Sequence, residues 1–285
     1  MEINHLLKKG VEMIKDREYG NPVLEAALLL GKLLNVDKTY IYTHGDTQVP
    51  QPTVDKFLEL MGMRKLGYPI QYILKEKEFM GLDFYVDEGV LIPRSDTETL
   101  VEYVLEYIDK KYKDEPINFL DLGIGSGAIV LSVAYYKKNV NAYGVDIHDI
   151  PLKIANINKE KFNLDNVSLH KGDLFQGIEG LEGKIHIIAS NPPYIPKREI
   201  ETLQSEVKDY EPMSALDGGD DGLIFYRKII PESKRYLKDG GLLIFEIGCD
   251  QGKEVENIFI REGYKDICIL KDLQGLDRVV LGTMK

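Results

Sequence analysis

The chain has 285 residues, of which 44% are hydrophobic and 29% are charged. This composition is typical of a folded globular protein and excludes a fibrous or disordered one, and the length is enough for about two domains with separate cores. The 47 acidic and 36 basic residues give a net charge of −11, which argues against a broad surface for nucleic acid phosphates, because such a surface is basic.

Cysteines, histidines and apolar segments narrow the class further. The two cysteines are too few for a disulfide framework or a cysteine-built zinc site, and the five histidines show no ligand spacing, so we expect no metal. The N-terminus carries charges throughout and lacks the apolar region of a signal peptide. No uncharged apolar run reaches about 18 residues, so we expect no membrane span and a cytoplasmic location.

Residues 1–68 are predicted to form a small helical domain. Asn21 and Pro22 are typical of an N-cap followed by proline in the first helical turn, and the leucines and alanines after them give a wide apolar face. Residues 51–66 predict a second amphipathic helix, because their apolar side chains recur with helical spacing.

Residues 69–90 are rich in Ile, Tyr, Phe and Val, which favours a short β linker. We expect a hairpin or extended bridge here, with residues 71–73 and 83–86 as its extended segments. Ser95 and Glu98 then have the spacing of a capping box, which predicts a helix to about residue 110.

Residues 91–285 are predicted to form an α/β domain with a mostly parallel sheet, because strand and helix patterns alternate from residue 117. Strands are expected at 117–122, 141–146, 167–170, 184–190, 241–247, 266–270 and 278–281, and helices at 126–137, 150–162, 223–237 and 251–262. The last two strands leave no room for a helix between them, which predicts one antiparallel strand at the end. Residues 86–285 contain 35 of the acidic and 25 of the basic residues, so this domain carries most of the negative charge.

A glycine turn lies directly between the first predicted strand of this domain and the helix after it. The turn consists of Gly123, Ile124, Gly125, Ser126 and Gly127. Glycine there allows positive φ and a close approach of the backbone to a ligand. Asp146 ends the next strand, 23 residues after Gly123, with Ile147 following it, and its carboxylate can accept hydrogen bonds from ribose hydroxyls. This pattern serves NAD and S-adenosylmethionine equally, and a plain tight turn with a strand-end aspartate is the alternative.

Two features favour S-adenosylmethionine over NAD. Asp121 precedes the first glycine, where it can hold the ammonium group of the ligand directly or through water. The third glycine also departs from the spacing used for a pyrophosphate. After the third strand, Asp173 can accept from the adenine amino group and Leu174 or Phe175 can cover the ring, although a solvated acid beside a core aromatic is an equal alternative.

The tetrapeptide Asn191, Pro192, Pro193 and Tyr194 follows the fourth strand. A planar NH₂ group has two donors, and the Asn191 side-chain oxygen and the Pro192 carbonyl can accept one hydrogen bond each. The prolines stiffen the loop and add no donor, and Tyr194 can stack on the planar group. Hydrogen bonds accepted from both N–H groups return electron density to the nitrogen. This effect strengthens in the transition state. Asn191, Pro192 and Tyr194 are therefore the catalytic candidates, with Asn191 also beside the cofactor, and a proline-rich turn with a packed tyrosine is the alternative.

Three other features stay open. Arg94 contacts substrate or cofactor, or else pairs with Asp96 or Glu98. Residues 218–222 form a lid or an ordinary loop. Glu246 faces the cofactor or caps the helix after its strand.

The glycine turn together with the tetrapeptide resembles class I S-adenosylmethionine-dependent methyltransferases that act on planar nitrogens. The flanking sequences narrow the resemblance to the release factor glutamine methyltransferases, known as PrmC or HemK, over essentially the whole chain; they are residues 25–30, 67–73, 91–98, 211–223, 225–227, 245–248 and 277–280. This resemblance implies a Rossmann-like sheet, mostly parallel with one antiparallel end strand, a helical N-terminal domain and a short β linker. Leu174 departs from the family, which often has an aromatic residue at this position.

The resemblance also implies the reaction. The enzyme would transfer a methyl group from S-adenosylmethionine to the side-chain amide nitrogen of the glutamine in the Gly-Gly-Gln motif of class I peptide chain release factors. The N-terminal domain would recognise the release factor, and we expect a monomer that requires no nucleic acid or membrane. The alternatives are a glutamine methyltransferase for a ribosomal protein, an adenine methyltransferase for nucleic acid, a non-catalytic binding module and a dehydrogenase.

Overall fold

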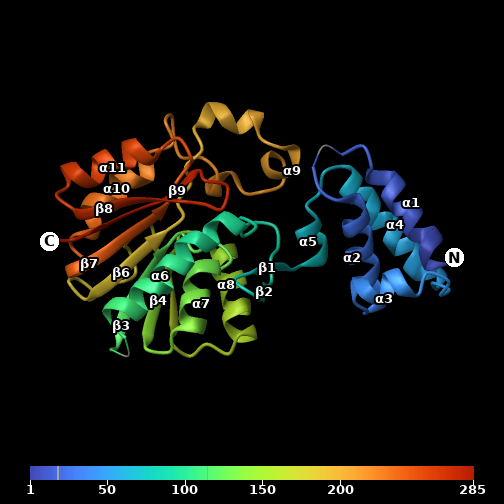
Figure 1. Cartoon of the computed structure of the whole chain (residues 1–285), viewed down its shortest axis with the longest axis horizontal. Helices are drawn as coiled ribbons and strands as arrows, with labels where there is room; N and C mark the ends of the chain where they lie inside the picture. The colour runs from blue at the N-terminus through green and yellow to red at the C-terminus, as the bar shows by residue number, and fades with distance from the viewer. Residues whose placement is uncertain (18, 114) are drawn as a thin grey trace. The chain divides into compact units, whose positions relative to one another are not determined.

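The computed structural model describes residues 1–17, 19–113 and 115–285 (Figure 1). The chain divides into two compact units, one of Met1–Glu76 with Gln204–Tyr210 and the other of Lys77–Leu203 with Glu211–Lys285. The assignment of residues 1–68, 69–90 and 91–285 to a recognition domain, a linker and a methyltransferase domain stays a prediction. In the described part of the chain, no helix is both long enough and apolar enough to cross a membrane.

The first unit is helical. Its helices are α1 (Ile3–Ile14), α2 (Pro22–Leu34), α3 (Lys38–Thr43), α4 (Gln51–Lys65), α5 (Ile70–Leu74) and α9 (Ser205–Lys208). The predicted cap of α2 is confirmed, because the Asn21 side chain accepts a hydrogen bond from the Leu24 N–H at 3.1 Å. The expected extended segment at residues 71–73 is wrong. These residues lie in α5, where burial of Ile70 and Tyr72 outweighs their preference for strands.

A buried ion pair fixes the short segment of α9 to the other helices of this unit. Arg64 of α4 donates to Glu25 of α2 with an Nε–Oε2 distance of 2.6 Å, and its Nη1 donates to Glu206 at 2.6 Å. The Arg64 side chain is only 2% exposed. Loss of either carboxylate would leave part of this buried charge unpaired, which is strongly destabilising. The Glu206 contact therefore holds residues 204–210 to the first unit, although their neighbours in sequence belong to the second.

The second unit begins with a hairpin of β1 (Lys77–Phe79) and β2 (Leu82–Phe84). It continues through a 3₁₀ turn at Ser95–Thr97 into α6 (Glu98–Lys111). The predicted capping box is wrong, because no side-chain cap forms at this helix. The Glu98 carboxylate instead accepts from the Met80 N–H at 2.7 Å, which ties the helix to the hairpin.

A sheet of seven strands forms the centre of the second unit. The strands are β3 (Ile117–Leu122), β4 (Val140–Asp146), β5 (Val167–Lys171), β6 (Ile185–Ser190), β7 (Leu237–Glu246), β8 (Lys265–Lys271) and β9 (Asp277–Thr283). Their order is β5-β4-β3-β6-β7-β9-β8, and all pairs from β5 to β7 are parallel. The expected single antiparallel strand is β9, the last in the chain, which lies between β7 and β8.

Helices cover both faces of this sheet, as the alternating pattern predicts (Figure 1). They are α7 (Ala128–Tyr136), α8 (Asp149–Lys161), α10 (Ile224–Ser233) and α11 (Gly252–Arg261). One hydrophobic core contains buried side chains of α6, α7 and α8, and a second contains those of α10 and α11. The chain runs from β3 outward to β5 and then resumes on the other side of β3 with β6. At such a reversal of strand order, an open α/β sheet has its ligand crevice at the carboxyl ends of the strands.

Asn158 of α8 joins three backbone groups beneath this crevice. Its side chain accepts from the Tyr85 N–H at 2.7 Å and donates to the carbonyls of Tyr85 at 2.9 Å and Ser126 at 3.0 Å. The residue is fully buried. The side chain therefore connects α8, the segment after the hairpin and the glycine turn.

Replacing Asn158 by Ala is expected to lower the free energy of unfolding by about 3 kcal/mol, because the substitution leaves buried backbone groups without partners. Asn156→Ala is the matched control on the same helix, since Asn156 is exposed and its side chain donates to the Leu152 carbonyl; it should change stability by less than about 0.5 kcal/mol. Urea unfolding of the full chain measures both. Equal effects of the two substitutions would contradict this role of Asn158.

Candidate functional site

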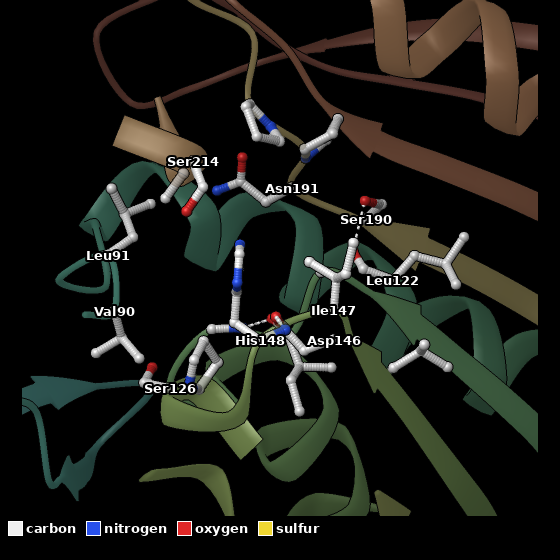
Figure 2. A pocket seen from close by; sticks show the side chains of 18 of the residues that line it. Val90, Leu91, Leu122, Ser126, Asp146, Ile147, His148, Ser190, Asn191 and Ser214 are labelled. Atoms are coloured by element: carbon white, nitrogen blue, oxygen red, sulfur yellow. Dashed lines mark hydrogen bonds between the residues drawn. The ribbon is translucent and has the colours of Figure 1, made fainter. Parts of the chain in front are cut away.

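A pocket lies where β3, β4 and β6 end, and their last residues Leu122, Asp146 and Ser190 line it (Figure 2). It encloses about 1080 Å³ of space free of protein atoms, counting its open mouth. Most of the predicted site residues line it together: Gly123, Ile124, Gly125, Ser126, Asp146, Ile147, Asp173, Leu174, Asn191, Pro192 and Pro193. Asp121, Gly127, Phe175 and Tyr194 lie behind this lining.

The glycines of the turn differ in what surrounds them. Gly123 and Gly125 have φ values of 75° and 54°, and no described atom lies within 4 Å of the position that a Cβ would take at either. Both backbones are therefore open to a ligand. At Gly127, with φ of 84°, a Cβ would lie 2.8 Å from Leu131 and 3.2 Å from Ala155. This third glycine serves the packing of α7 and α8 and does not face the pocket.

Asp146 holds the glycine turn to the end of β4. Its Oδ2 accepts from the Gly125 N–H at 3.1 Å and its Oδ1 from the His148 N–H at 3.0 Å. Burial raises the pKa of Asp146, although these backbone donors oppose the rise. Figure 2 shows the His148 side chain pointing into the pocket from beside this carboxylate. Each carboxylate oxygen keeps a lone pair for a ligand hydroxyl.

Asp121 lies one step deeper. It is 1% exposed. Its Oδ2 accepts from the Val130 N–H at 3.1 Å, while Oδ1 is buried without a partner among the described residues. Burial raises the pKa of Asp121 to about 7, and the nearby Asp146 adds to the rise. The free oxygen marks a place where a donor or a cation would be stabilised.

Asn191 is held by its neighbours at the end of β6. The Ser190 hydroxyl donates to the Leu122 carbonyl at 2.7 Å and so joins the ends of β6 and β3. The Asn191 Nδ2 donates to the Thr97 Oγ1 at 3.3 Å. Figure 2 shows the Asn191 side chain at the pocket wall. Because Nδ2 is committed to Thr97, the Oδ1 acceptor is left for a ligand.

Tyr194 does not present its ring to the pocket. The ring packs against the core formed with α10 and α11, and its hydroxyl donates to Glu246 at 3.3 Å. Burial, and secondly the Glu246 carboxyl, raise the pKa of Tyr194 above its usual range. The predicted stacking of this ring on a substrate therefore finds no support in the lining of the pocket.

The segment 218–222 rests on the backbone of Tyr194. A Cβ on Gly218 would lie 2.8 Å from the Tyr194 Cα, and one on Gly222 would lie 2.3 Å from the Tyr194 carbonyl oxygen. That carbonyl also accepts from the Gln251 Nε2 at 2.8 Å. Only glycine permits this approach, so the segment supports the Asn191 loop from behind.

The residues predicted to lie near the adenine differ in whether they line the pocket. Phe175 is 2% exposed and stacks on Tyr236, with ring centroids 4.7 Å apart. Leu174 and Asp173 line the pocket. Of the two apolar candidates, Leu174 therefore faces the pocket and Phe175 belongs to the core.

Sequence patterns missed several lining residues. They are Val90, Leu91, Thr97, His148, Ser190, Ser214 and Phe225. Ser190 lies at a strand end and His148 just after one, and Leu91, Thr97, Ser214 and Phe225 lie in segments that resemble the family, which were the available signals; Val90 had none. Arg94 also lines the pocket, and its Nη2 donates to both carboxylate oxygens of Glu211 at 2.7 and 2.8 Å. Of the two alternatives for Arg94, contact with substrate or cofactor stays a prediction, and the pairing with Asp96 or Glu98 gives way to a pairing with Glu211.

Asp121→Asn is expected to reduce the loss of stability that the protein suffers as the pH rises. The folded state holds the Asp121 proton with a pKa of about 7, against a usual value of 3.8. Stability from this group is therefore present below about pH 4 and is lost as the pH rises through 7, by at most about 4 kcal/mol. Asparagine keeps an oxygen for the Val130 N–H and carries no charge. Urea unfolding of both proteins at pH 5 and pH 8 measures the difference, and the same pH dependence in both would contradict this assignment.

Comparisons with known proteins agree with this arrangement. A family model described as PrmC N-terminal domain matches residues 5–74, and a methyltransferase domain model matches residues 113–266. The solved structure of a methyltransferase from Pyrococcus furiosus superposes with a TM-score of 0.52 at 20% identity, covering 75% of this chain and 93% of that one. This likeness concerns the fold alone and agrees with the mostly parallel α/β sheet.

Two relatives match over nearly their full length. A release factor glutamine methyltransferase of Clostridium acetobutylicum is 42% identical over 285 residues, covering 99% of each chain. One of Clostridium botulinum is 43% identical over 282 residues, covering 98% of each. The resemblance drawn from the glycine turn, the tetrapeptide and their flanks is thus confirmed, and the chain belongs to the release factor glutamine methyltransferase family, whose members are S-adenosylmethionine-dependent enzymes.

Proposed function

We propose that this chain transfers a methyl group from S-adenosylmethionine to the side-chain amide nitrogen of the glutamine in the Gly-Gly-Gln motif of class I peptide chain release factors. The observation that carries the proposal is the state of Asn191. Its Nδ2 is committed to Thr97, so it offers an acceptor to a pocket that also contains Asp146 and the glycine turn. The release factor comes from the names of the relatives, and the tripeptide comes from the family resemblance.

The residues beside the glycine turn fit the cofactor. We assign Gly123 and Gly125 to the backbone cradle, Asp146 to the ribose hydroxyls, and the unpartnered Oδ1 of Asp121 to the ammonium group, directly or through water. Asp173 and Leu174 are assigned to the adenine. When bound, S-adenosylmethionine supplies a methyl group on a positively charged sulfur.

Asn191 and Pro192 are assigned to the substrate amide. The Asn191 Oδ1 and the Pro192 carbonyl each accept a hydrogen bond from one N–H of the glutamine NH₂ group. These two hydrogen bonds orient the nitrogen and return electron density to it. Such preorganised contacts act where charge develops, in a site from which bulk water is excluded. Tyr194 is assigned a supporting role, because its hydroxyl is bound to Glu246 and its ring is outside the lining. A nitrogen with a delocalised lone pair gains nucleophilicity in this way without a strong base, and the proton that it loses passes to water after the methyl transfer.

The alternatives are weighed by charge and by the N-terminal match. A duplex substrate requires a basic groove for its phosphates, whereas residues 86–285 contain 35 acidic and 25 basic residues. A glutamine in a ribosomal protein would suit the same acceptors, but the N-terminal family match favours the release factor. A monomer in the cytoplasm remains our prediction.

The proposed reaction is tested by offering the purified chain labelled S-adenosylmethionine with an unmodified class I release factor, its Gln→Ala variant in the Gly-Gly-Gln motif, or duplex DNA. Label should enter only the unmodified factor, because only its glutamine offers the planar NH₂ group in the right protein. Label in DNA, or equal label in the Gln→Ala variant, would contradict the proposal.

Asn191→Ala is expected to lower kcat about 100- to 1000-fold, since it removes a preorganised contact to the reacting group. The affinity for S-adenosylmethionine should change by less than about threefold. Asp146→Asn is the complementary variant on the same pocket and should weaken cofactor binding more than it lowers kcat. Isothermal titration and steady-state kinetics separate the two effects, and near-normal turnover by Asn191→Ala would refute the assigned role.

A further inference from the structure

A buried polar cluster lies behind the Asn191 loop. It consists of Thr97, at the end of the 3₁₀ turn before α6, and Glu246, the last residue of β7. Thr97 is 4% exposed and Glu246 is 1% exposed. Burying a carboxyl at this depth costs folding free energy unless the carboxyl is hydrogen-bonded or paired with a cation.

The Thr97 hydroxyl touches the residue that receives the substrate. Its Oγ1 accepts from the Asn191 Nδ2 at 3.3 Å. A hydroxyl has one proton to donate, and in this geometry the proton is turned away from Asn191. A hydroxyl can accept from the Asn191 Nδ2 or donate to the Asn191 Oδ1, so the group that takes the Thr97 proton decides which end of the amide faces the pocket.

Glu246 is the acceptor available for that proton. The Tyr194 hydroxyl donates to its Oε1 at 3.3 Å, while its Oε2 is buried with no hydrogen-bond partner among the described residues. The Thr97 hydroxyl lies close enough to favour the ionised carboxyl without completing a bond to Oε2.

The charges around Glu246 keep it an acceptor near neutral pH. Burial raises the pKa of Glu246 to about 6, while Thr97, Arg278 and Tyr194 oppose the rise and Asp96 adds to it. Arg278 is itself shared with Asp96 at 3.5 Å and Asp272 at 3.1 Å. Above pH 7 the carboxyl is therefore mostly ionised, and an ionised carboxylate accepts hydrogen bonds but donates none.

We infer that Glu246 and Thr97 are positioning residues that set the direction of the hydrogen bonds to the substrate. Glu246 accepts the proton of Thr97, Thr97 accepts from the Asn191 Nδ2, and the Asn191 Oδ1 is thereby turned to accept from the substrate NH₂ group. If the order were reversed, Asn191 would present its own NH₂ group and repel the substrate. The inference rests on the proposed function, because it explains how Asn191 keeps the orientation that the function needs.

The test compares variants that change the direction of these hydrogen bonds with variants that keep it. Thr97→Val removes the hydroxyl at nearly constant shape, and Glu246→Gln adds a donor where only an acceptor stood. Each should lower kcat about 10- to 100-fold, as small misplacements of reacting groups do. The cofactor affinity should change less than about threefold. Thr97→Ser restores the hydroxyl and should return kcat to within a few-fold of the parent.

Two further comparisons separate positioning from damage to the fold. Ser233→Ala removes another fully buried hydroxyl of this unit, bonded to Tyr264 and the Ile230 carbonyl; it should lower stability with kcat unchanged. The double variant Thr97→Val with Glu246→Gln should lose no more than the larger single loss, since both act through one chain of hydrogen bonds.

The outcomes distinguish this inference from the proposed function. Normal kcat in Thr97→Val, or multiplied losses in the double variant, would overturn the inference. Failure of Thr97→Ser to recover activity would overturn it too. If Asn191→Ala itself kept normal turnover, the proposed function would fail first. An inactive Asn191→Ala together with a fully active Thr97→Val would refute the roles inferred for Thr97 and Glu246 and leave the proposed function standing.

Discussion

The site depends on the hydrogen bonds that the Asp146 carboxylate accepts from the backbone of Gly125 and His148. They join the end of β4 to the glycine turn after β3, so that two neighbouring strands present one ligand surface. The Ser190 hydroxyl extends this connection to β6 through the Leu122 carbonyl. Parallel strands bring their carboxyl ends to one edge, and these few polar contacts fix the turns that follow them.

Two carboxyl groups buried behind this surface are costly to the unliganded protein. Burial raises the pKa of Asp121 to about 7 and that of Glu246 to about 6. Each has one oxygen without a hydrogen-bond partner among the described residues. We assign Asp121 to the cationic end of the cofactor and Glu246 to the orientation of Asn191. On this account one acid serves binding, the other serves turnover, and both trade stability for function.

Much of the fold follows from local patterns in the sequence. Continuous apolar runs separated by amphipathic helices predict a mostly parallel sheet, and the lack of a helix between the last two predicted strands predicts the one antiparallel strand, β9. The cap at Asn21 is equally local. The extended segment at 71–73 and the capping box at Ser95 are wrong, because burial of Tyr72 and the contact from Glu98 to the Met80 N–H depend on residues brought close only by folding.

In the site, too, local sequence patterns do not reveal contacts that form only on folding. The glycine turn, Asp146 and Asn191 are recognisable because each lies at the end of a strand or directly after it. Phe175 and Tyr194 also follow strands, yet their rings turn into the core, which no spacing reveals. Arg64, Thr97 and Glu246 owe their roles to contacts across long stretches of sequence. Residues that touch a ligand through the backbone or a strand end are therefore easier to predict than those that support them.

The most direct test of the account is a crystal structure of the chain with S-adenosylhomocysteine and a peptide containing Gly-Gly-Gln. We expect the glutamine nitrogen within about 3.2 Å of both the Asn191 Oδ1 and the Pro192 carbonyl oxygen. The Asn191 Nδ2 should still donate a hydrogen bond to the Thr97 Oγ1. A glutamine amide bound elsewhere, or its carbonyl oxygen facing the Asn191 Nδ2, would contradict it.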